Sequence, residues 1–430
     1  MSRLAYPSAL AVLRRGVEVD LHDVLTAAVS PLEGQDPVIY LVDFGHRVLM
    51  PLPVAMSRPI PNEEDVATTM AGRAFATGQP MTAERDGKVR VWVPIIEGTE
   101  RTGVLAVTVP AVDPEILADL NLLGGFAGLA INCIASVSDL PHLRRQGRTM
   151  SLAATMQWEL MPPLAATTDR VSIAGVLEPA YDIAGDGFDY AFNSGEVDFA
   201  LFDAMGHGIA SSMLTTLAVG AYRHSRRRHS PVANIHAAVH QAVAEQYSGE
   251  AFATGIIGRL ATGSGELQWS CAGHPPPLLL RHRKVVAELS CDPALPFGLD
   301  AATPVVSRYT LQPGDAVLLY TDGVVEARTS LGEEFGLDRL RDFLEREAAS
   351  EHLAEELLRR LVRAVLDYQG SDLRDDATLL LLQWTGAPIP PATTPTVTSV
   401  PGQRLLPERK TFTELGETTA GPHDTLATDS

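Results

Sequence analysis

Four short acidic motifs stand out, each where an apolar run meets a glycine or a turn. They are Ala184-Gly185-Asp186-Gly187-Phe188-Asp189, Asp203-Ala204-Met205-Gly206-His207-Gly208, Thr321-Asp322-Gly323 and Asp375-Asp376-Ala377-Thr378. A single Asp-Gly pair marks only a turn, but a buried carboxylate without a partner costs several kcal/mol. Four such motifs call for a shared counter-ion, and carboxylate oxygens suit Mg²⁺ or Mn²⁺. The residues alone leave a metal-dependent hydrolase and a set of turns about equally open.

The surrounding residues, 170–385, alternate runs typical of strands with longer helical patterns. We expect strands at 171–177, 197–203, 252–260, 266–272, 316–321 and 377–384, and helices at about 208–224, 231–247, 336–347 and 351–368. In the last helix Leu353, Leu357, Leu361 and Val365 recur every four residues, which predicts one apolar face. Consecutive strands with separated helices favour helices layered on sheets over a βαβ array.

The motifs also have a recognisable order. From 151 to 384 they resemble the metal-dependent serine/threonine phosphatases of the PPM type, in the bacterial SpoIIE/RsbU-like branch. Besides the acidic motifs, the resemblance is carried by Leu160-Met161-Pro162, Glu178-Pro179-Ala180, Phe252-Ala253-Thr254, Ala272-Gly273-His274-Pro275-Pro276-Pro277, Leu295-Pro296-Phe297-Gly298 and Pro313-Gly314-Asp315. It implies an α-β-β-α sandwich, in which two packed sheets are flanked by helices.

The resemblance also implies a centre of two Mn²⁺ or Mg²⁺ ions. Its ligands would be Asp186, Asp203, the backbone carbonyl of Ala204, Asp322 and Asp375, with Asp376 as the alternative to Asp375. Asp203 would bridge the two ions, and Asp189 and Asp376 would bind water nearby. Such an ion pair activates water for in-line attack on a phosphoryl group, so that no protein nucleophile is needed.

One departure from the family pattern lies in the first motif. The usual Gly-Gly-Asp-Phe-Tyr-Asp is replaced, so that Gly187 stands where an aromatic residue is usual. We expect Gly187 to loosen the loop or to alter substrate contacts. The metal carboxylates all remain, so we expect an active enzyme.

Three further features have two interpretations each. His207 either donates to phosphate or braces its turn, and His274 is interpreted as a buried turn histidine rather than a reacting group. The run from Arg223 to His229 holds four arginines; it is either a solvated helix end, favourable for the helix dipole, or a docking site for an acidic partner.

Residues 1–140 mix strands (38–43, 89–95, 103–109) and helices (64–77, 114–137). From about Asp20 to Val137 they resemble a GAF sensor domain, through Tyr40–Asp43, Ala71–Gly78, Val91–Ile95 and Arg101–Leu105. The expected fold class is therefore α+β multidomain: a GAF-like α/β sensor and a sandwich phosphatase. GAF domains bind small molecules or only dimerise, and no Cys or His is placed for a haem.

Residues 141–169 are expected to form a helical linker, either a plain connection or one that transmits a signal. Residues 386–430 contain seven Pro and ten Thr in 45 positions, which predicts a disordered tail.

Composition narrows the class of partner and the compartment. With 34 basic and 53 acidic residues in 430, the net charge is −19, which argues against nucleic-acid or anionic-membrane binding. Cys133, Cys271 and Cys291 are too few and scattered for a disulfide framework, which indicates a reduced, cytoplasmic protein. The apolar stretch Leu120–Val137 contains polar residues and glycines, and predicts a core helix rather than a membrane span.

Together these features predict a cytoplasmic phosphatase, regulated by the GAF-like domain and working as a homodimer. The resemblance implies a phosphoserine or phosphothreonine substrate on a STAS-type anti-anti-sigma protein. Two alternatives remain: a scaffold that binds the phosphoprotein without hydrolysing it, and a hydrolase of small phosphoesters.

Overall fold

The computed structural model describes residues 21–52, 61–97, 100–178, 181, 185–292, 294–299, 304–347, 354–370 and 375–386. All of them belong to one compact unit that covers residues 1–390. The predicted tail lies outside the described residues, apart from its first position, and so do Pro179, Ala180 and Ala184.

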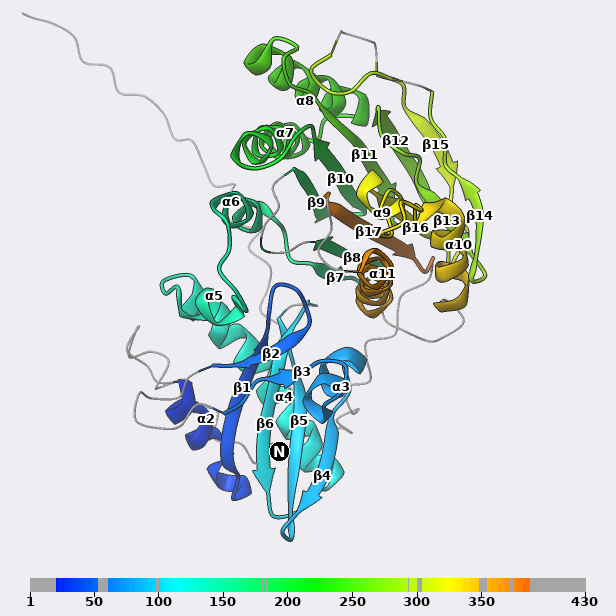
Figure 1. Ribbon diagram of the computed structural model, residues 1–430. Helices are drawn as coiled ribbons and strands as arrows, with labels where there is room; N and C mark the ends of the chain where they lie inside the picture. Colours follow the sequence, from blue (N-terminus) through cyan, green and yellow to red (C-terminus); the bar gives the residue numbers. More distant parts are fainter. Residues whose placement is uncertain are drawn as a thin grey trace, which may run out of the picture. The chain divides into compact units, whose positions relative to one another are not determined.

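The N-terminal part is a six-stranded antiparallel sheet with strand order β3-β2-β1-β6-β5-β4 (Figure 1). Its strands are β1 (Gln35–Val42), β2 (Val48–Pro51), β3 (Glu64–Asp65), β4 (Met81–Arg85), β5 (Lys88–Glu97) and β6 (Glu100–Val109). Its helices are α2 (Leu21–Val29), η1 (Ser30–Leu32), α3 (Met70–Thr77) and α4 (Pro114–Ala135). One apolar core joins α2 and α4 to the sheet, and a second joins α3 to residues that alternate with the first set along the strands.

Two helices of this part, α3 and α4, bear on the expectations. The helix expected at 64–77 begins later, because the side chain of Thr69 accepts a hydrogen bond from Gly72 N and caps α3, while Glu64 and Asp65 pair with β2. Helix α4 is long and apolar enough to cross a membrane by length and composition, and 44% of its most apolar window is buried. Its buried side packs on the sheet, as in a core helix.

The linker is not one helix. It forms α5 (Leu140–Arg145), α6 (Leu152–Leu160) and the short strand β7 (Ala165–Thr167), which pairs with β8. Ser151 interrupts the helical pattern, because its side chain caps α6 by accepting from Ala154 N. Pro162 and Pro163 then keep α6 from continuing. The end of the predicted linker is thus part of the next domain's sheet.

The C-terminal part contains two antiparallel sheets. The first has the order β15-β12-β11-β10-β9 and the second β14-β13-β16-β17-β8-β7. The strands are β8 (Val171–Glu178), β9 (Asp186–Asn193), β10 (Glu196–Ala204), β11 (Ala253–Ala261), β12 (Glu266–Ala272), β13 (Leu278–Arg281), β14 (Lys284–Glu288), β15 (Ser307–Thr310), β16 (Ala316–Tyr320) and β17 (Ala377–Trp384). The helices are α7 (Ile209–Arg226), α8 (Val232–Tyr247), α9 (Asp322–Val325), α10 (Gly336–Glu347) and α11 (Ala354–Gln369).

The layers follow the expected α-β-β-α order (Figure 1). A central core holds apolar residues from both sheets, for example Phe188 and Leu201 from one and Leu319 and Leu380 from the other. The outer face of the five-stranded sheet packs on α7 and α8, and that of the six-stranded sheet on α10 and α11. Strands such as β10 and β17 therefore place alternate residues in two different cores.

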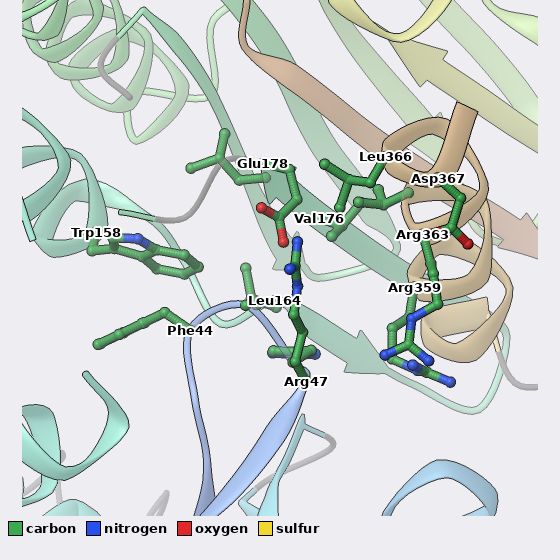
Figure 2. Close-up of a pocket in the computed structure, with 14 residues that line it drawn as sticks. Phe44, Arg47, Trp158, Leu164, Val176, Glu178, Arg359, Arg363, Leu366 and Asp367 are labelled. Atoms are coloured by element: carbon green, nitrogen blue, oxygen red, sulfur yellow. The ribbon is translucent and has the colours of Figure 1, made fainter. Parts of the chain in front are cut away.

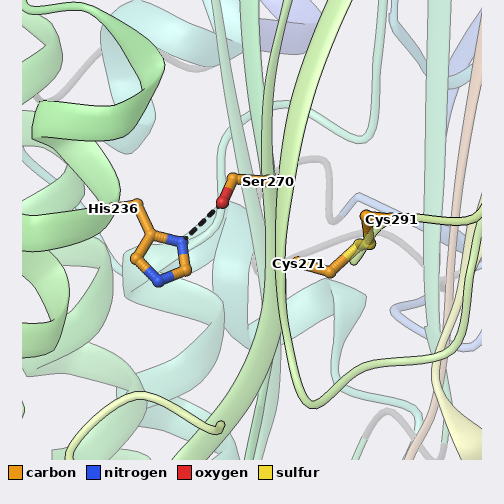
Figure 3. Close-up of a disulfide and its surroundings, with 4 residues drawn as sticks. All are labelled: His236, Ser270, Cys271 and Cys291. Atoms are coloured by element: carbon orange, nitrogen blue, oxygen red, sulfur yellow. Dashed lines mark hydrogen bonds between the residues drawn. A yellow bond between two sulfur atoms is a disulfide. The ribbon is translucent and has the colours of Figure 1, made fainter. Parts of the chain in front are cut away.

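The expectation that the cysteines stay unpaired is wrong for two of them. Cys271 and Cys291 form a disulfide with a Cα–Cα distance of 6.4 Å (Figure 3). Cys133 is free and exposed. Cys271 ends β12 in one sheet, and Cys291 follows β14 of the other. Only sheet packing brings them together, so their spacing of 20 residues gave no sign of it. The inference of a reducing compartment loses its basis.

Reduction of this disulfide is expected to destabilise the protein. Closing a loop of about 20 residues restricts the unfolded chain by about 3 kcal/mol in the loop-entropy model. We expect Tm to fall by several degrees on treatment with a phosphine reductant, and the Cys271→Ser variant to show the lower value without treatment. Cys133→Ser is the control and keeps the wild-type response. An unchanged Tm in a protein shown by mass spectrometry to have been reduced would contradict this.

Candidate metal centre

The first two candidate ligands lie side by side on neighbouring strands. Asp186 starts β9, Asp203 lies near the end of β10, and the antiparallel register places them directly opposite each other. Asp186 is 1% exposed. Ala204, the third candidate, follows Asp203, and its N–H donates to the carbonyl of Gly185 at 3.2 Å.

The other candidates come from the second sheet. Asp322 follows β16 and begins α9, and Asp375 and Asp376 immediately precede β17, the neighbour of β16. The two turns touch at Gly323, where an added Cβ would lie 1.9 Å from the carbonyl oxygen of Asp376. Any side chain there would push Asp322 away from Asp375, so glycine is required by close approach of the backbone.

Hydrogen bonds join the candidates of the first sheet to those of the second. One oxygen of Asp376, Oδ2, accepts from Gly185 N at 2.6 Å and from Asp186 N at 3.0 Å. Thr321 Oγ1 donates to Asp186 Oδ2 at 2.7 Å. The six residues that the resemblance implies therefore lie at neighbouring strand ends of the two sheets.

The carboxylates of this cluster repel one another. Burial, followed by the charges of Asp203 and Asp376, raises the pKa of Asp186 well above its usual range. Burial, followed by the charges of Asp322, Asp375 and Asp376, raises the pKa of Asp203 to about 7. The pKa of Asp322 is raised as well, by burial and by Asp375. A cation is the missing partner that would hold these groups ionised together.

The donor chemistry fits hard divalent ions, which prefer carboxylate and carbonyl oxygens. Among the described residues, no group of three or more His, Cys, Asp or Glu side chains is arranged to hold a metal ion as it stands. The case for metal therefore rests on the buried, mutually repelling oxygens and not on a preformed cage.

The raised pKa of Asp203 predicts that ionisation of this carboxyl lowers the stability of the metal-free protein as pH rises. The folded state keeps this proton up to about pH 7, while the unfolded chain loses it near 3.8. The folded state thus binds more protons in that window, and the Asp203 contribution to stability falls as pH rises. Buried His46, His236 and His274, whose pKa values are lowered, act in the opposite direction.

The difference in stability between wild type and Asp203→Asn isolates the contribution of Asp203. We expect Asp203→Asn to be more stable than wild type in metal-free buffer, with an advantage in denaturant midpoint that grows from pH 5 to pH 8. Because bound Mn²⁺ favours the ionised wild-type carboxylate, saturating Mn²⁺ should abolish or reverse that advantage. An advantage independent of pH would contradict the assignment of the penalty to Asp203.

The expectation that Asp189 binds water near the metals is wrong. It lies three positions after Asp186, so its side chain leaves the opposite face of β9, towards α7. There its carboxylate, 2% exposed, pairs with Arg223 and with Arg226, both at 2.9 Å. Asp189 therefore fixes α7 on the sheet.

These ion pairs also limit both interpretations of the basic run to its exposed residues. Arg226 is buried and Arg223 half-buried, and Arg223 Nη2 donates to the carbonyl of Leu160 at 2.6 Å. Only the remainder of the run, such as Arg227 and Arg228, is exposed. Two of the four arginines are thus internal ties.

Gly187 does not loosen the loop by leaving space. A Cβ at this position would lie 2.8 Å from Thr215 Cγ2 on α7 and 3.2 Å from Met161 Cε. The room that an aromatic side chain would take is filled by α7 and by the residue after α6. The expected effect on substrate contacts is not tested.

Two contacts at this site were missed by the sequence reasoning. Gln157, a buried residue of α6, donates to the backbone carbonyl of Asp186, and Thr215 of α7 donates to that of Gly185. Neither residue belongs to an acidic motif, so only the fold could associate them with the metal loop.

Exposed apolar side chains gather beside the cluster. Met205, Ile209 and Met213 are 44%, 49% and 54% exposed, and they lie just after Asp203 and on the first turns of α7. His207 is exposed in the same turn. His274 is 8% exposed and hydrogen-bonded through both ring nitrogens, as expected for a buried histidine.

The turn between β1 and β2 packs against α6. The Phe44 ring lies 4.7 Å from the Trp158 ring, centroid to centroid, and Tyr181 Oη donates to Asp43 Oδ2 at 3.0 Å. A cavity of about 120 Å³ adjoins this contact (Figure 2). Figure 2 shows the Arg47 side chain directed towards Glu178, while Arg359 and Arg363 of α11 line the other side.

Comparison with known proteins agrees with the arrangement of the acidic motifs. Residues 193–385 match the family model described as stage II sporulation protein E (SpoIIE). The phosphoserine phosphatase RsbU of Bacillus subtilis (strain 168) is 22% identical over 244 residues, which cover 54% of this chain and 69% of RsbU.

Two solved structures are also similar to this chain. The RsbU and RsbW domains of a Mycobacterium tuberculosis protein are 27% identical over 53% of this chain and 63% of theirs, with a TM-score of 0.44. The catalytic domain of the serine/threonine phosphatase PstP, solved with two manganese ions, is 17% identical over 50% of this chain and 98% of its own, with a TM-score of 0.37. At these TM-scores the superpositions add nothing to the sequence matches.

Proposed function

We propose that this chain, which carries a phosphatase domain of the SpoIIE and RsbU type, removes phosphate from phosphoserine or phosphothreonine in a protein. The observation that carries the proposal is the convergence of Asp186, Asp203, Asp322 and Asp375 from two sheets, with raised pKa values at the first three. Hydrolysis at two divalent ions is the chemistry that such an oxygen-rich centre supports.

The residues that would hold Mn²⁺ or Mg²⁺ follow from their positions. Asp186 and Asp203 would bind one ion with the Ala204 carbonyl, and Asp203, Asp322 and Asp375 the other. Asp375 is favoured over Asp376 because Asp376 Oδ2 already accepts from two backbone amides, while Asp375 is exposed and lies near Asp322. Bound ions would supply charge neutralisation and an activated water. Asp376 and Thr321 would hold Asp186 in place.

A protein substrate is favoured over a small phosphoester by the surface around the centre. Exposed Met205, Ile209 and Met213 offer apolar area that a small, polar phosphoester would not use. Within that class we propose a phosphorylated STAS-type protein. The test is release of phosphate from such a protein in Mn²⁺, in competition with a nucleotide monophosphate. Preference for the nucleotide would favour the small-phosphoester alternative.

The scaffold alternative makes a different prediction in the same assay. A chain that binds without hydrolysing would take up Mn²⁺ and the phosphoprotein, as calorimetry would show, but would release no phosphate. The intact carboxylates and the dense packing at Gly187 favour the enzyme.

We also propose that the N-terminal, GAF-like domain regulates the centre through α6. Two adjacent residues of α6 face the two partners: Trp158 contacts Phe44, and Gln157 donates to the carbonyl of Asp186. Tyr181 adds a second route, because it binds Asp43 and lies five residues before Asp186. A ligand that shifts the β1–β2 turn would therefore alter the hold on Asp186.

Phe44→Ala tests this coupling in the full chain. Loss of the ring contact should loosen α6, and so weaken Mn²⁺ binding severalfold although Phe44 is not a ligand. Calorimetric titration with Mn²⁺ measures this, and Thr82→Ala, an exposed change on β4 of the same domain, is the control. Equal Mn²⁺ affinity in Phe44→Ala and wild type would contradict the route.

A homodimer completes the proposal. The exposed side of α4 carries Leu122 and Leu129, 54% and 62% exposed, and no charged residue between them. Such a face suits a second copy of an acidic chain, because two copies can approach there without like charges meeting. Sedimentation velocity of wild type and Leu129→Asp would test it.

A further inference from the structure

His274 joins the two sheets at the metal centre. It lies in the connection from β12 to β13, and its ring is buried. Nδ1 lies 2.9 Å from Thr254 Oγ1 on β11, and Nε2 lies 3.1 Å from the carbonyl oxygen of Tyr320 at the end of β16. Thr254 pairs in register with Asp203, and Tyr320 precedes Asp322 by two residues. The ring therefore spans both halves of the acidic cluster.

The partners determine which nitrogen of His274 carries a proton. A backbone carbonyl can only accept, so Nε2 must be the N–H that donates to Tyr320. Burial lowers the pKa of His274 to about 4, so the ring is neutral at pH 7 and carries one proton. Nδ1 is then left without hydrogen, and it accepts from the Thr254 hydroxyl.

Because the Thr254 hydroxyl donates its proton to His274 Nδ1, it presents only an acceptor to the acidic cluster. A hydroxyl has one proton and two lone pairs. Thr254 Oγ1 also lies 3.4 Å from Asp203 Oδ2, near the limit for a hydrogen bond. Its one proton is directed at the nearer Nδ1, 2.9 Å away, so two acceptors face each other when Asp203 holds a cation, and a donor placed beside both is required. A water molecule is the smallest group that donates to two acceptors.

We propose that His274 is a positioning residue: it fixes the Thr254 hydroxyl so that its oxygen accepts a hydrogen bond from a water held beside Asp203. The proposal rests on the proposed two-metal phosphatase, because that water is the one such a centre would use or order. It explains why a histidine, and not an apolar residue, occupies the buried space between the sheets. Thr254 acts on the water and His274 acts through Thr254.

The first test needs neither substrate nor metal. In protein labelled with ¹⁵N-histidine, with His274→Gln used for assignment, the spectrum at pH 7 should show His274 protonated at Nε2 and bare at Nδ1. The opposite tautomer, or a charged ring, would reverse the direction at Thr254 and overturn the proposal. If His274→Gln fails to fold, assignment through Thr254→Val, which perturbs the same signal, replaces it.

The second test uses paired substitutions at Thr254. Thr254→Val keeps the shape and loses the hydroxyl, and should lower kcat about 10- to 100-fold, the range seen when outer partners of metal sites are removed. KM for the phosphoprotein should stay within about twofold, since no substrate contact is lost. Thr254→Ser, which restores the hydroxyl, should recover most of kcat.

Two further readouts separate positioning from packing. Mn²⁺ affinity, measured by calorimetry, should fall severalfold in Thr254→Val and recover in Thr254→Ser. Adding His274→Gln to Thr254→Val should cost little more, because both act through one water. Full kcat and Mn²⁺ affinity in Thr254→Val would overturn the proposal. If wild type releases no phosphate while the tautomer and Mn²⁺ results hold, the proposed function fails and the positioning role stands.

Discussion

Asp203→Asn is expected to lower kcat/KM for phosphoprotein hydrolysis by at least about a thousandfold. Asp203 faces Asp186 across the strand pair and has Asp322, Asp375 and Asp376 as charged neighbours, so it lies between the two halves of the cluster. Removing it would cost several kcal/mol of charge stabilisation at the ions, and each 1.4 kcal/mol or so is a factor of ten in rate. Steady-state kinetics with saturating Mn²⁺ measure the loss.

The same strand offers a matched control. Asp198 lies five residues earlier on β10 and is 1% exposed, but it pairs with Arg259 at 2.7 Å instead of facing other carboxylates. Asp198→Asn should keep most of the activity of the folded protein and lose stability. Asp203→Asn should lose activity in the presence of Mn²⁺ and gain stability in metal-free buffer. Comparable activity losses in both variants would mean that any buried charge on β10 matters equally, and the assignment would fail.

Asp189→Ala is expected to lower the free energy of unfolding by about 3–5 kcal/mol, the usual cost of breaking a buried ion pair. The substitution leaves Arg226, 8% exposed, without its carboxylate partner, and frees Arg223 from β9. Urea denaturation of metal-free protein measures the loss. Arg228→Ala, in the exposed part of the same run, should change stability by less than about 0.5 kcal/mol.

Mn²⁺ affinity distinguishes this structural role from a role at the metals. In protein that remains folded, Asp189→Ala should bind Mn²⁺ with an affinity close to that of wild type. A variant with normal stability and weakened Mn²⁺ binding would instead place Asp189 at the centre, as its position in the motif first indicated.

The family resemblance implied the sandwich, while the periodic spacing of apolar residues predicted only that helices lie on sheets. The strict spacing of Leu357, Leu361 and Val365 reports the face of α11 that packs on its sheet, and the acidic motifs mark the strand ends that meet. Strand β9 was not predicted, because the acidic and small residues of Asp186–Asn193 were interpreted as a turn motif, although Phe188, Tyr190 and Phe192 alternate as in a half-buried strand.

The errors have the same origin. Asp189 was assigned by its place in a motif, although the two-residue period of β9 sends its side chain to the face opposite Asp186. Cys271 and Cys291 meet through packing of two sheets, and Gln157 reaches Asp186 from another helix. Such contacts depend on how elements pack, and one sequence carries little trace of that.

The central claim is that Asp186, Asp203, Asp322 and Asp375 form one centre for two divalent ions. Its most direct measurement is the Mn²⁺ stoichiometry of the full chain by calorimetry at pH 7.5, with Asp322→Asn and Asp198→Asn in parallel. We predict two ions per chain in wild type and in Asp198→Asn, and loss of one in Asp322→Asn. Absence of Mn²⁺ binding in folded wild type, or two ions in Asp322→Asn with undiminished affinity, would contradict it.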